Sequence, residues 1–142
     1  MSSAPGPIFI RTATTVDAAA CVAIYRPLVE STAVSFETIV PSVEEFAARI
    51  QNSLSAWTWL ISHRGQGVGS QLYRRLFTDL ASLGYCNAYA GVTQPNEASM
   101  ALHRGVGFEY IGTFRSVGRK FDRWHDVAWF QRKLRETPLG VP

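Results

Sequence analysis

The sequence lacks the features that mark membrane, secreted and disulfide-stabilised proteins. No apolar run approaches the ~20 residues that a helix needs to span a bilayer. Residues 1–7 lack the charged and apolar regions of a signal peptide, and we interpret them as a flexible tail. The two cysteines, Cys21 and Cys86, are too few for a disulfide framework and show no metal-binding spacing. We therefore expect buried free thiols, a cytoplasmic protein and no metal.

Charged residues are also sparse, at 18% of the chain, whereas 46% of the residues are hydrophobic. This balance is typical of a globular protein, and 142 residues suffice for one domain with its own core. We expect a single domain over 8–134 and a C-terminal tail over 135–142.

The net charge of +3 is spread unevenly along the chain. Residues 1–62 carry three arginines against five acidic residues, whereas residues 63–142 carry eleven basic against six acidic residues. The second part therefore favours an anionic ligand. Because the basic residues form no single run and no nucleic-acid motif is found, a phosphorylated small molecule fits better than nucleic acid or a membrane.

Local patterns predict an alternation of helices and strands. Thr14 or Thr15 is expected to cap a first helix, which Pro27 should kink or end near Arg26. The predicted elements are a strand over 8–11, a helix over 16–28, a loop over 30–36, a helix capped by the Ser42-x-x-Glu45 box, a strand over 57–61, a helix over 71–83 ended by Gly84, a strand over 86–92, a helix over 96–104 closed by Gly105 and Gly107, and strands over 108–117 and 127–132. This order predicts an α/β architecture, with α+β features and a mixed sheet.

A glycine-rich loop, Arg64-Gly65-Gln66-Gly67-Val68-Gly69-Ser70, precedes the third predicted helix. Glycines leave backbone N–H groups unobstructed, and the helix start adds unpaired donors and the positive end of its dipole. The loop therefore suits a pyrophosphate, although a plain turn is the simpler interpretation. A nucleotide-binding P-loop would need lysine before Ser70, and a dinucleotide fingerprint would need an acidic residue beyond the helix rather than Asp79 inside it.

Three motifs in order resemble the GNAT acetyltransferase superfamily: Arg64-x-x-Gly67-x-Gly69, then Asn96-x-x-Ser99-x-x-Leu102-His103, then Gly107-Phe108. The chain is most similar to the phosphinothricin and L-amino-acid N-acetyltransferase branch. That similarity rests on Glu30-Ser31-Thr32 leading to Phe36, on His103 where most relatives have tyrosine, and on Trp124-His125-Asp126-Val127. The resemblance covers 8–134 and implies a GNAT-like fold with acetyl-CoA as cosubstrate.

The resemblance also implies site residues. The cofactor-binding residues would be Arg64, Gly65, Gln66, Gly67, Val68, Gly69, Ser70, Asn96 and Ser99. His103 would protonate the departing thiolate, since imidazole titrates near neutral pH. It could instead touch the cofactor without proton transfer, and Asn96 could be a helix N-cap after Pro95, alone or in addition.

The substrate side is implied to involve Glu30, Phe36, Trp124 and His125, which would contact a primary amine of an amino acid or a phosphinothricin-like molecule. Alternatively, Trp124 and His125 form an aromatic turn before the last strand or a dimer contact, and Glu30 and Phe36 are plain core or surface residues. The resemblance implies direct acetyl transfer in a homodimer. Neither cysteine has a paired histidine that would point to a covalent intermediate.

One departure from the family pattern affects catalysis. The resemblance implies three strands between the second helix and the glycine loop, but only 57–61 is present, so roughly 25–40 residues are missing. The missing part includes the central strand and the glutamate that serves as general base in that branch. An internal deletion, completion of the sheet by a partner's strand, and a segment absent from the sequence all explain this gap. A catalytically impaired cofactor-binding or interaction module is therefore the alternative function.

Overall fold

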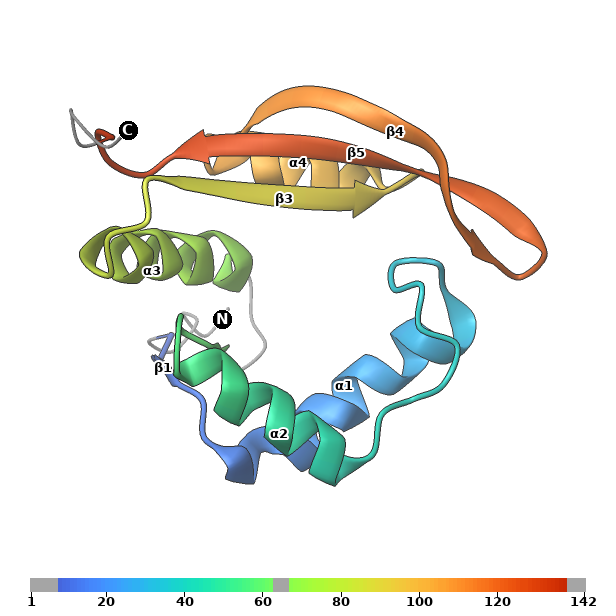
Figure 1. Cartoon of the computed structure of the whole chain (residues 1–142), viewed down its shortest axis with the longest axis horizontal. Helices are drawn as coiled ribbons and strands as arrows, with labels where there is room; N and C mark the ends of the chain where they lie inside the picture. The colour runs from blue at the N-terminus through green and yellow to red at the C-terminus, as the bar shows by residue number, and fades with distance from the viewer. Residues whose placement is uncertain (1–7, 63–66, 138–142) are drawn as a thin grey trace, which may run out of the picture.

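The structure is a computed structural model, and it describes residues 8–62 and 67–137 (Figure 1). The elements follow in the order β1 (Ile10–Thr12), the 3-10 turn η1 (Thr15–Asp17), α1 (Ala18–Ser31), α2 (Val43–Leu54), β2 (Leu60–Ser62), α3 (Val68–Ser82), β3 (Asn87–Thr93), α4 (Glu97–Gly105), β4 (Glu109–Lys120) and β5 (Arg123–Lys133). The predicted α/β class is confirmed, but the predicted mixed sheet is wrong for the described residues, because all of their strand pairings are antiparallel. Part of the predicted tails, 1–7 and 138–142, lies outside the described residues.

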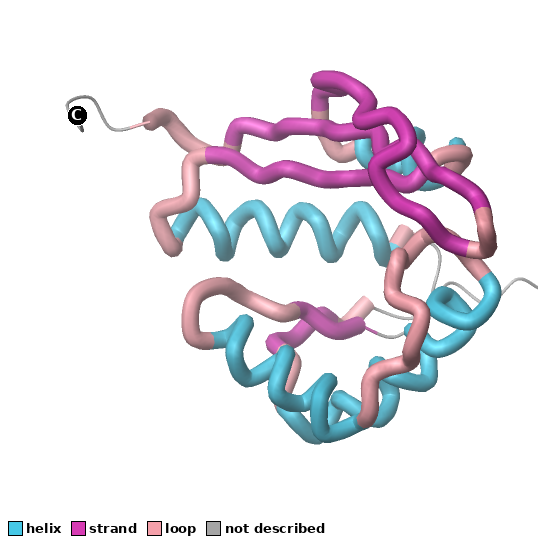
Figure 2. The backbone as a smooth tube through the Cα atoms, turned by 45° about the vertical axis from the view of Figure 1, so that its right-hand side comes forward, coloured by secondary structure: helices cyan, strands magenta, loops and turns pink. Residues whose placement is uncertain are grey.

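Two separate antiparallel sheets organise these elements. β1 pairs with β2, with Ile10 opposite Ser62, and the second sheet has the order β3-β5-β4. Within the described residues, β2 therefore pairs only with β1, and β3 pairs only with β5. In both backbone views, α3 lies between the three-stranded sheet and the N-terminal elements β1, α1, α2 and β2 (Figures 1 and 2).

Each sheet has its own hydrophobic core. The C-terminal core joins α3 and α4 to the three-stranded sheet through Phe77, Met100, Val92 and Phe130. The N-terminal core joins α1 and α2 to the β1–β2 pair, and its buried members are Ala13, Ala18, Val22, Phe46 and Ile50. The amphipathic pattern of α2 explains this packing, since Phe46 and Ile50 are one helical turn apart.

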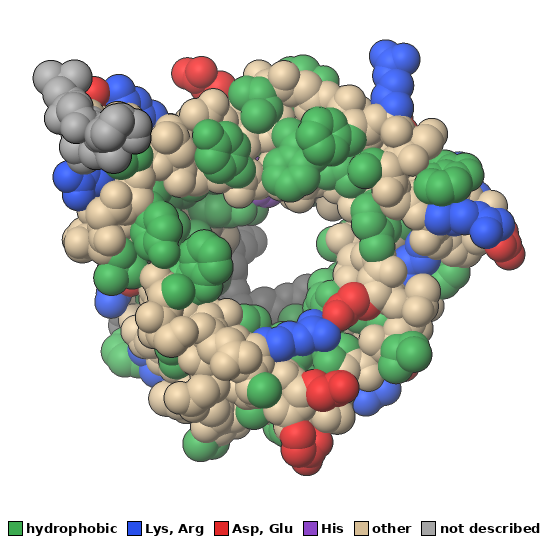
Figure 3. Space-filling view, viewed as in Figure 1, with side chains coloured by type: hydrophobic (Ala, Val, Ile, Leu, Met, Phe, Trp, Pro, Cys, Tyr) green, Lys and Arg blue, Asp and Glu red, His purple; other side chains and the backbone are tan. Residues whose placement is uncertain are grey.

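The described part of the molecule encloses a central opening, which is visible in the space-filling view (Figure 3). One side of the opening is closed where α3 lies against β2. On the other side, the buried Lys120 at the end of β4 donates hydrogen bonds to the carbonyls of Val29 (2.6 Å) and Ser35 (2.8 Å). Close packing supports this junction, because a Cβ on Gly118 would lie 2.1 Å from the Phe36 ring.

Short sequence motifs correctly predicted the start of α2 and the ends of α3 and α4. Ser42 and Glu45 form the capping box, with Ser42 N donating to Glu45 at 2.8 Å and Glu45 N donating to Ser42 at 3.1 Å. Gly84 and Gly107 follow α3 and α4 with φ of 98° and 87°. The amides of Tyr85 and Phe108, one residue further on, bond back to Leu80 and His103, as in Schellman motifs.

The predicted end of the first helix near Arg26 is wrong. α1 continues through Pro27 to Ser31, so the carbonyl of Ala23 loses its helical donor. The extra turn buries Val29, which is 1% exposed, and Thr32 caps the end by donating its hydroxyl to the Leu28 carbonyl at 2.6 Å.

The predicted boundaries of the last two strands are too narrow. β4 and β5 form a long hairpin with a two-residue turn at Phe121 and Asp122, both with positive φ. Trp124 and His125 therefore lie within β5, not in a turn before it. The ladder is irregular near Ser116, whose amide donates to the Asp126 carboxylate at 2.7 Å.

Candidate active site and cofactor-binding loop

The start of α3 presents unpaired backbone donors. The helix begins at Val68, three residues earlier than predicted, and Gly67 is its N-cap with φ of 78°. Gln71 N bonds the Gly67 carbonyl at 3.3 Å, so the N–H groups of Val68, Gly69 and Ser70 precede the first intrahelical bond. Gly67 has no side chain to cap them, and these donors suit an anion. The predicted residues Arg64, Gly65 and Gln66 lie outside the described residues.

The two described glycines of the loop have different roles. A Cβ built on Gly67 meets no described atom within 4 Å, so a side chain at this position would not clash with the described part of the chain. A Cβ on Gly69 would lie 3.2 Å from Leu102 of α4, so this glycine lets the two helices approach closely. The start of α3 therefore combines unpaired backbone donors with close packing against α4.

An apolar cavity of about 340 Å³ runs from Gly69 along α3. One wall belongs to α3, and the other to the segment that leads into β2; the lining residues are Thr58, Trp59, Leu60, Gly69, Leu72, Tyr73 and Leu76. A second cavity of about 410 Å³ continues past Tyr73 and Leu76 to Ala88 and Ala90 of β3. A pyrophosphate at the helix start could thus extend an uncharged arm along either cavity.

Asn96 is the N-cap of α4, and its side-chain oxygen accepts a hydrogen bond from Ser99 N at 3.1 Å. The N-cap interpretation is therefore confirmed. Contact of Asn96 or Ser99 with the cofactor stays a prediction.

His103 is buried, at 6% exposure, and both ring nitrogens have partners. Nδ1 lies 2.6 Å from the Ser99 carbonyl, which can only accept, so Nδ1 carries a proton. In the neutral ring Nε2 then accepts from the Tyr73 hydroxyl at 2.7 Å. Burial raises the pKa of Tyr73, which keeps that hydroxyl protonated. Tyr73 lines both cavities whereas His103 lines neither, so His103 reaches them only through Tyr73.

Only two of the four predicted substrate residues come together. The rings of Phe36 and His125 are 6.1 Å apart, and His125 Nε2 donates to the Lys120 carbonyl at 3.1 Å. Glu30 instead forms an exposed ion pair with Arg26 at 3.2 Å. Trp124 is 63% exposed on β5 and lies opposite Arg119 in the hairpin.

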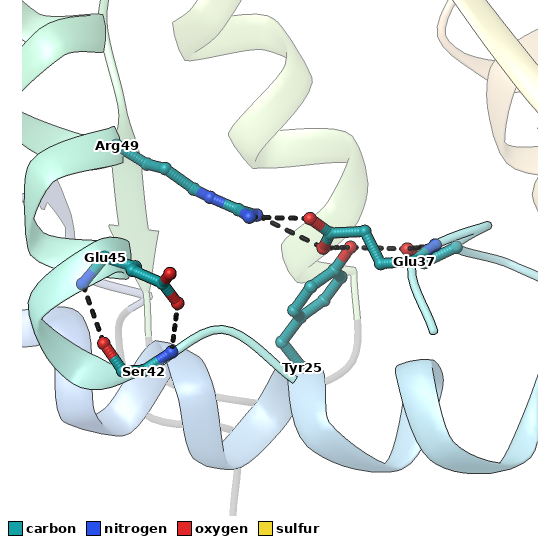
Figure 4. Close-up of polar contacts among 6 residues, drawn as sticks. Tyr25, Glu37, Ser42, Glu45 and Arg49 are labelled. Carbon is teal, nitrogen blue, oxygen red and sulfur yellow. Dashed lines mark hydrogen bonds and ion pairs between the residues drawn. The ribbon is translucent and has the colours of Figure 1, made fainter. Parts of the chain in front are cut away.

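A polar cluster around Glu37 was not predicted from the sequence (Figure 4). The Glu37 carboxylate accepts from Arg49 Nη2 at 2.6 Å and from the Tyr25 hydroxyl at 2.7 Å, and that hydroxyl lies 2.5 Å from Ser35 Oγ. The Arg49 guanidinium, and then the Tyr25 hydroxyl, lower the pKa of Glu37. The three main residues come from α1, the following loop and α2, so no short spacing could have identified them.

Among residues 8–62 and 67–137, no group of three or more His, Cys, Asp or Glu side chains is placed to hold a metal ion. None of the helices in that part of the chain is both long enough and apolar enough to cross a bilayer.

Comparison with known proteins identifies relatives. The profile described as Acetyltransferase (GNAT) family matches residues 53–108. A phosphinothricin N-acetyltransferase of Streptomyces coelicolor is 56% identical over 70 residues, which are 49% of this chain and 41% of that protein. The structure also resembles a GNAT superfamily phosphinothricin acetyltransferase from Sinorhizobium meliloti, solved in complex with AcCoA, at a TM-score of 0.86 and 24% identity, over 95% of this chain and 92% of that one.

A longer alignment bears on the missing strands. A phosphinothricin N-acetyltransferase of Streptomyces viridochromogenes is 28% identical over 166 positions, covering 93% of this chain and 91% of that protein. Because 93% of 142 residues is about 132, about 34 of the 166 positions face no residue of the chain. That number lies within the roughly 25–40 residues expected for two strands and their turns.

The match to the Streptomyces coelicolor protein covers less than half of that protein's length, so the activity of the whole relative does not follow from it. Residues 53–108 match the acetyltransferase (GNAT) family, and the fold of the chain is similar to that of a solved GNAT superfamily acetyltransferase.

Proposed function

We propose that the chain is an acetyl-CoA-dependent N-acetyltransferase that acts on the primary amine of an amino acid or a phosphinothricin-like small molecule. The observation that carries the proposal is the start of α3, where N–H groups without a side-chain cap lie beside an apolar cavity. The names of the Streptomyces relatives support the substrate class, and the AcCoA complex of the Sinorhizobium protein supports the cosubstrate.

The described residues would bind acetyl-CoA in two parts. The N–H groups of Val68, Gly69 and Ser70 would hold the pyrophosphate, helped by the helix dipole. The cavity between α3 and the segment before β2 would take the pantetheine arm, since its lining is mostly apolar. Acetyl-CoA supplies the activated thioester.

Transfer would be direct in this scheme. The amine loses a proton to water or a base and attacks the thioester carbonyl, so that a C–N bond forms as the C–S bond breaks. The thiolate then takes a proton from water or from the Tyr73 and His103 pair, whose hydroxyl reaches the cavity. We further propose a cytoplasmic homodimer; sedimentation equilibrium of the purified chain tests the dimer.

A catalytically impaired acetyl-CoA-binding module is the second candidate. It is favoured by the central opening and by the position of the acidic side chains. Glu37 is held by Arg49 and Tyr25, and Glu30 by Arg26, so neither is free to act as a base at the cavity.

Release of free thiol from acetyl-CoA separates the two candidates. The purified chain is incubated with acetyl-CoA and a panel of L-amino acids and phosphinothricin, and cosubstrate binding is measured in parallel by calorimetry. Amine-dependent thiol release supports the enzyme, whereas binding without release contradicts the enzyme and leaves the binding module. Absence of both contradicts the proposed cofactor site.

A further inference from the structure

One face of the three-stranded sheet packs against helices, and the other does not. Residues opposite each other in an antiparallel sheet point to the same face, so the register places the odd-numbered residues of β3 and β5 together. The even-numbered residues, which include Ala90, Val92 and Phe130, pack against α3 and α4. In Figure 1, α4 lies behind the sheet, and Figure 3 shows hydrophobic side chains gathered over the sheet's opposite, outer face.

Large apolar side chains from all three strands meet on this outer face. Tyr89 of β3, Ile111 and Phe114 of β4 and Trp129 of β5 line a cavity of about 340 Å³ together with Gly112, and none of these residues is charged. The ring centroids of Phe114 and Trp129 are 5.7 Å apart. Tyr89, Ile111 and Phe114 are 59%, 55% and 58% exposed. A contiguous apolar patch of this kind is typical of an interaction surface.

The outer face combines a hollow with projecting rings. A Cβ on Gly91 would lie 3.3 Å from the Trp129 ring, so this glycine lets the ring lie against β3. Tyr89 and Phe114 border the same cavity from the two outer strands and remain more than half exposed. A surface with both shapes can pack against a copy of itself, since each copy's exposed ring can enter the other's cavity in an isologous interface.

The apolar area of the patch suits a small dimer interface. A buried aromatic side chain covers about 150–250 Å², so Tyr89 and Phe114 offer about 100 Å² each, and Ile111 and Trp129 bring the total to about 300 Å². The smaller stable interfaces bury about 600 Å² per partner, of which about 60%, or about 360 Å², is apolar. A second copy on this face therefore comes close to that requirement.

We propose that two copies of the chain associate through this outer face, with the Phe114 and Trp129 rings of each copy near the centre of the interface. The proposal names the contact surface of the proposed homodimer and rests on that homodimer, but it does not depend on acetyl transfer. Removal of the rings from water drives the association. Glu109 and Gln131, which are paired on the same face, contribute to its polar rim.

Sedimentation equilibrium of the purified chain tests the surface. The unmodified chain should show a concentration-dependent equilibrium between monomer and dimer. Phe114→Glu places an unpaired charge from each copy in the apolar interface and should raise the Kd of the dimer at least about tenfold. Phe121→Glu is the matched control, because Phe121 is 55% exposed at the β4–β5 turn and does not line the cavity. The control should change the Kd less than about twofold. Circular dichroism checks that both variants are folded.

A mixture of Phe114→Glu and Phe114→Lys chains gives a second test that misfolding cannot imitate. Opposite charges then meet across the interface, so the mixture should associate at least about tenfold more tightly than either variant alone. No recovery in the mixture, equal effects of Phe114→Glu and Phe121→Glu, or an unchanged Kd for Phe114→Glu would overturn this surface and leave the homodimer in place. A monomeric unmodified chain would overturn both, whereas the acetyl-CoA proposal is decided separately by calorimetry.

Discussion

The hydrogen bond between Tyr73 and His103 gives a quantitative prediction about the site. Tyr73→Phe removes one hydroxyl and keeps the ring, whose centroid lies 5.5 Å from that of Phe77 and 5.3 Å from that of His103. The variant leaves the buried His103 Nε2 without its donor at 2.7 Å. An unsatisfied buried polar atom costs about 1–3 kcal/mol, so the free energy of unfolding should fall by about that amount.

Urea denaturation of the purified chain measures this change, with Tyr110→Phe as the matched control. Tyr110 is 52% exposed and its hydroxyl lies 2.8 Å from Thr113 Oγ1, so its loss should cost less than about 0.5 kcal/mol. Adding His103→Phe to Tyr73→Phe should cost less than the sum of the single changes, because the two residues share one bond. Equal stability of Tyr73→Phe and Tyr110→Phe would refute the reasoning.

Three further predictions concern the junction between β4 and the N-terminal elements and the ion pair of Glu37 with Arg49. Lys120→Met should lower the free energy of unfolding by about 1–3 kcal/mol in urea denaturation, because two carbonyls lose a buried donor. Gly118→Val should destabilise the chain by about 1–3 kcal/mol through contact with Phe36, whereas Gly105→Ala, with open space at its Cβ, should not. The pKa of Glu37 is lowered by Arg49, so the pair stabilises the fold above the ordinary carboxyl pKa and is lost as pH falls through the folded value. Stability of Glu37→Gln, measured from pH 7 down to pH 3, should therefore fall less steeply than that of the unmodified chain, and an unchanged slope would contradict this assignment.

Short-range signals in the sequence predicted much of the fold. The Ser42 box, the helix ends at Gly84 and Gly107 and the N-cap at Asn96 depend on residues three or four apart, so the chain itself carries the information. Pro27 and the β4–β5 turn were missed because tertiary packing decided them. Burial of Val29 extends α1, and no glycine marks the turn at 121–122.

The part of the candidate site that lies in one contiguous motif could be predicted from the sequence. Gly67 to Ser70 supply main-chain donors whose placement follows from the start of a helix. In contrast, the Tyr73 bond to His103 joins residues 30 apart, and the Arg49 ion pair with Glu37 joins α2 to the loop after α1. Such pairs depend on how the helices pack, which no local pattern records.

Calorimetric titration with acetyl-CoA tests the central claim, that the start of α3 holds the cofactor pyrophosphate. Gly67→Asp places a negative charge at the N-cap of α3, and Gly67→Asn adds nearly the same volume without charge. Gly84→Asp makes the same change at the other end of α3, where φ is also positive and a Cβ also meets no described atom within 4 Å. Circular dichroism confirms that each variant is folded.

We predict that Gly67→Asp weakens acetyl-CoA binding at least tenfold, or about 1.4 kcal/mol, relative to both Gly67→Asn and Gly84→Asp. Equal affinity of the folded Gly67→Asp and Gly84→Asp variants for acetyl-CoA would contradict the assignment of this site.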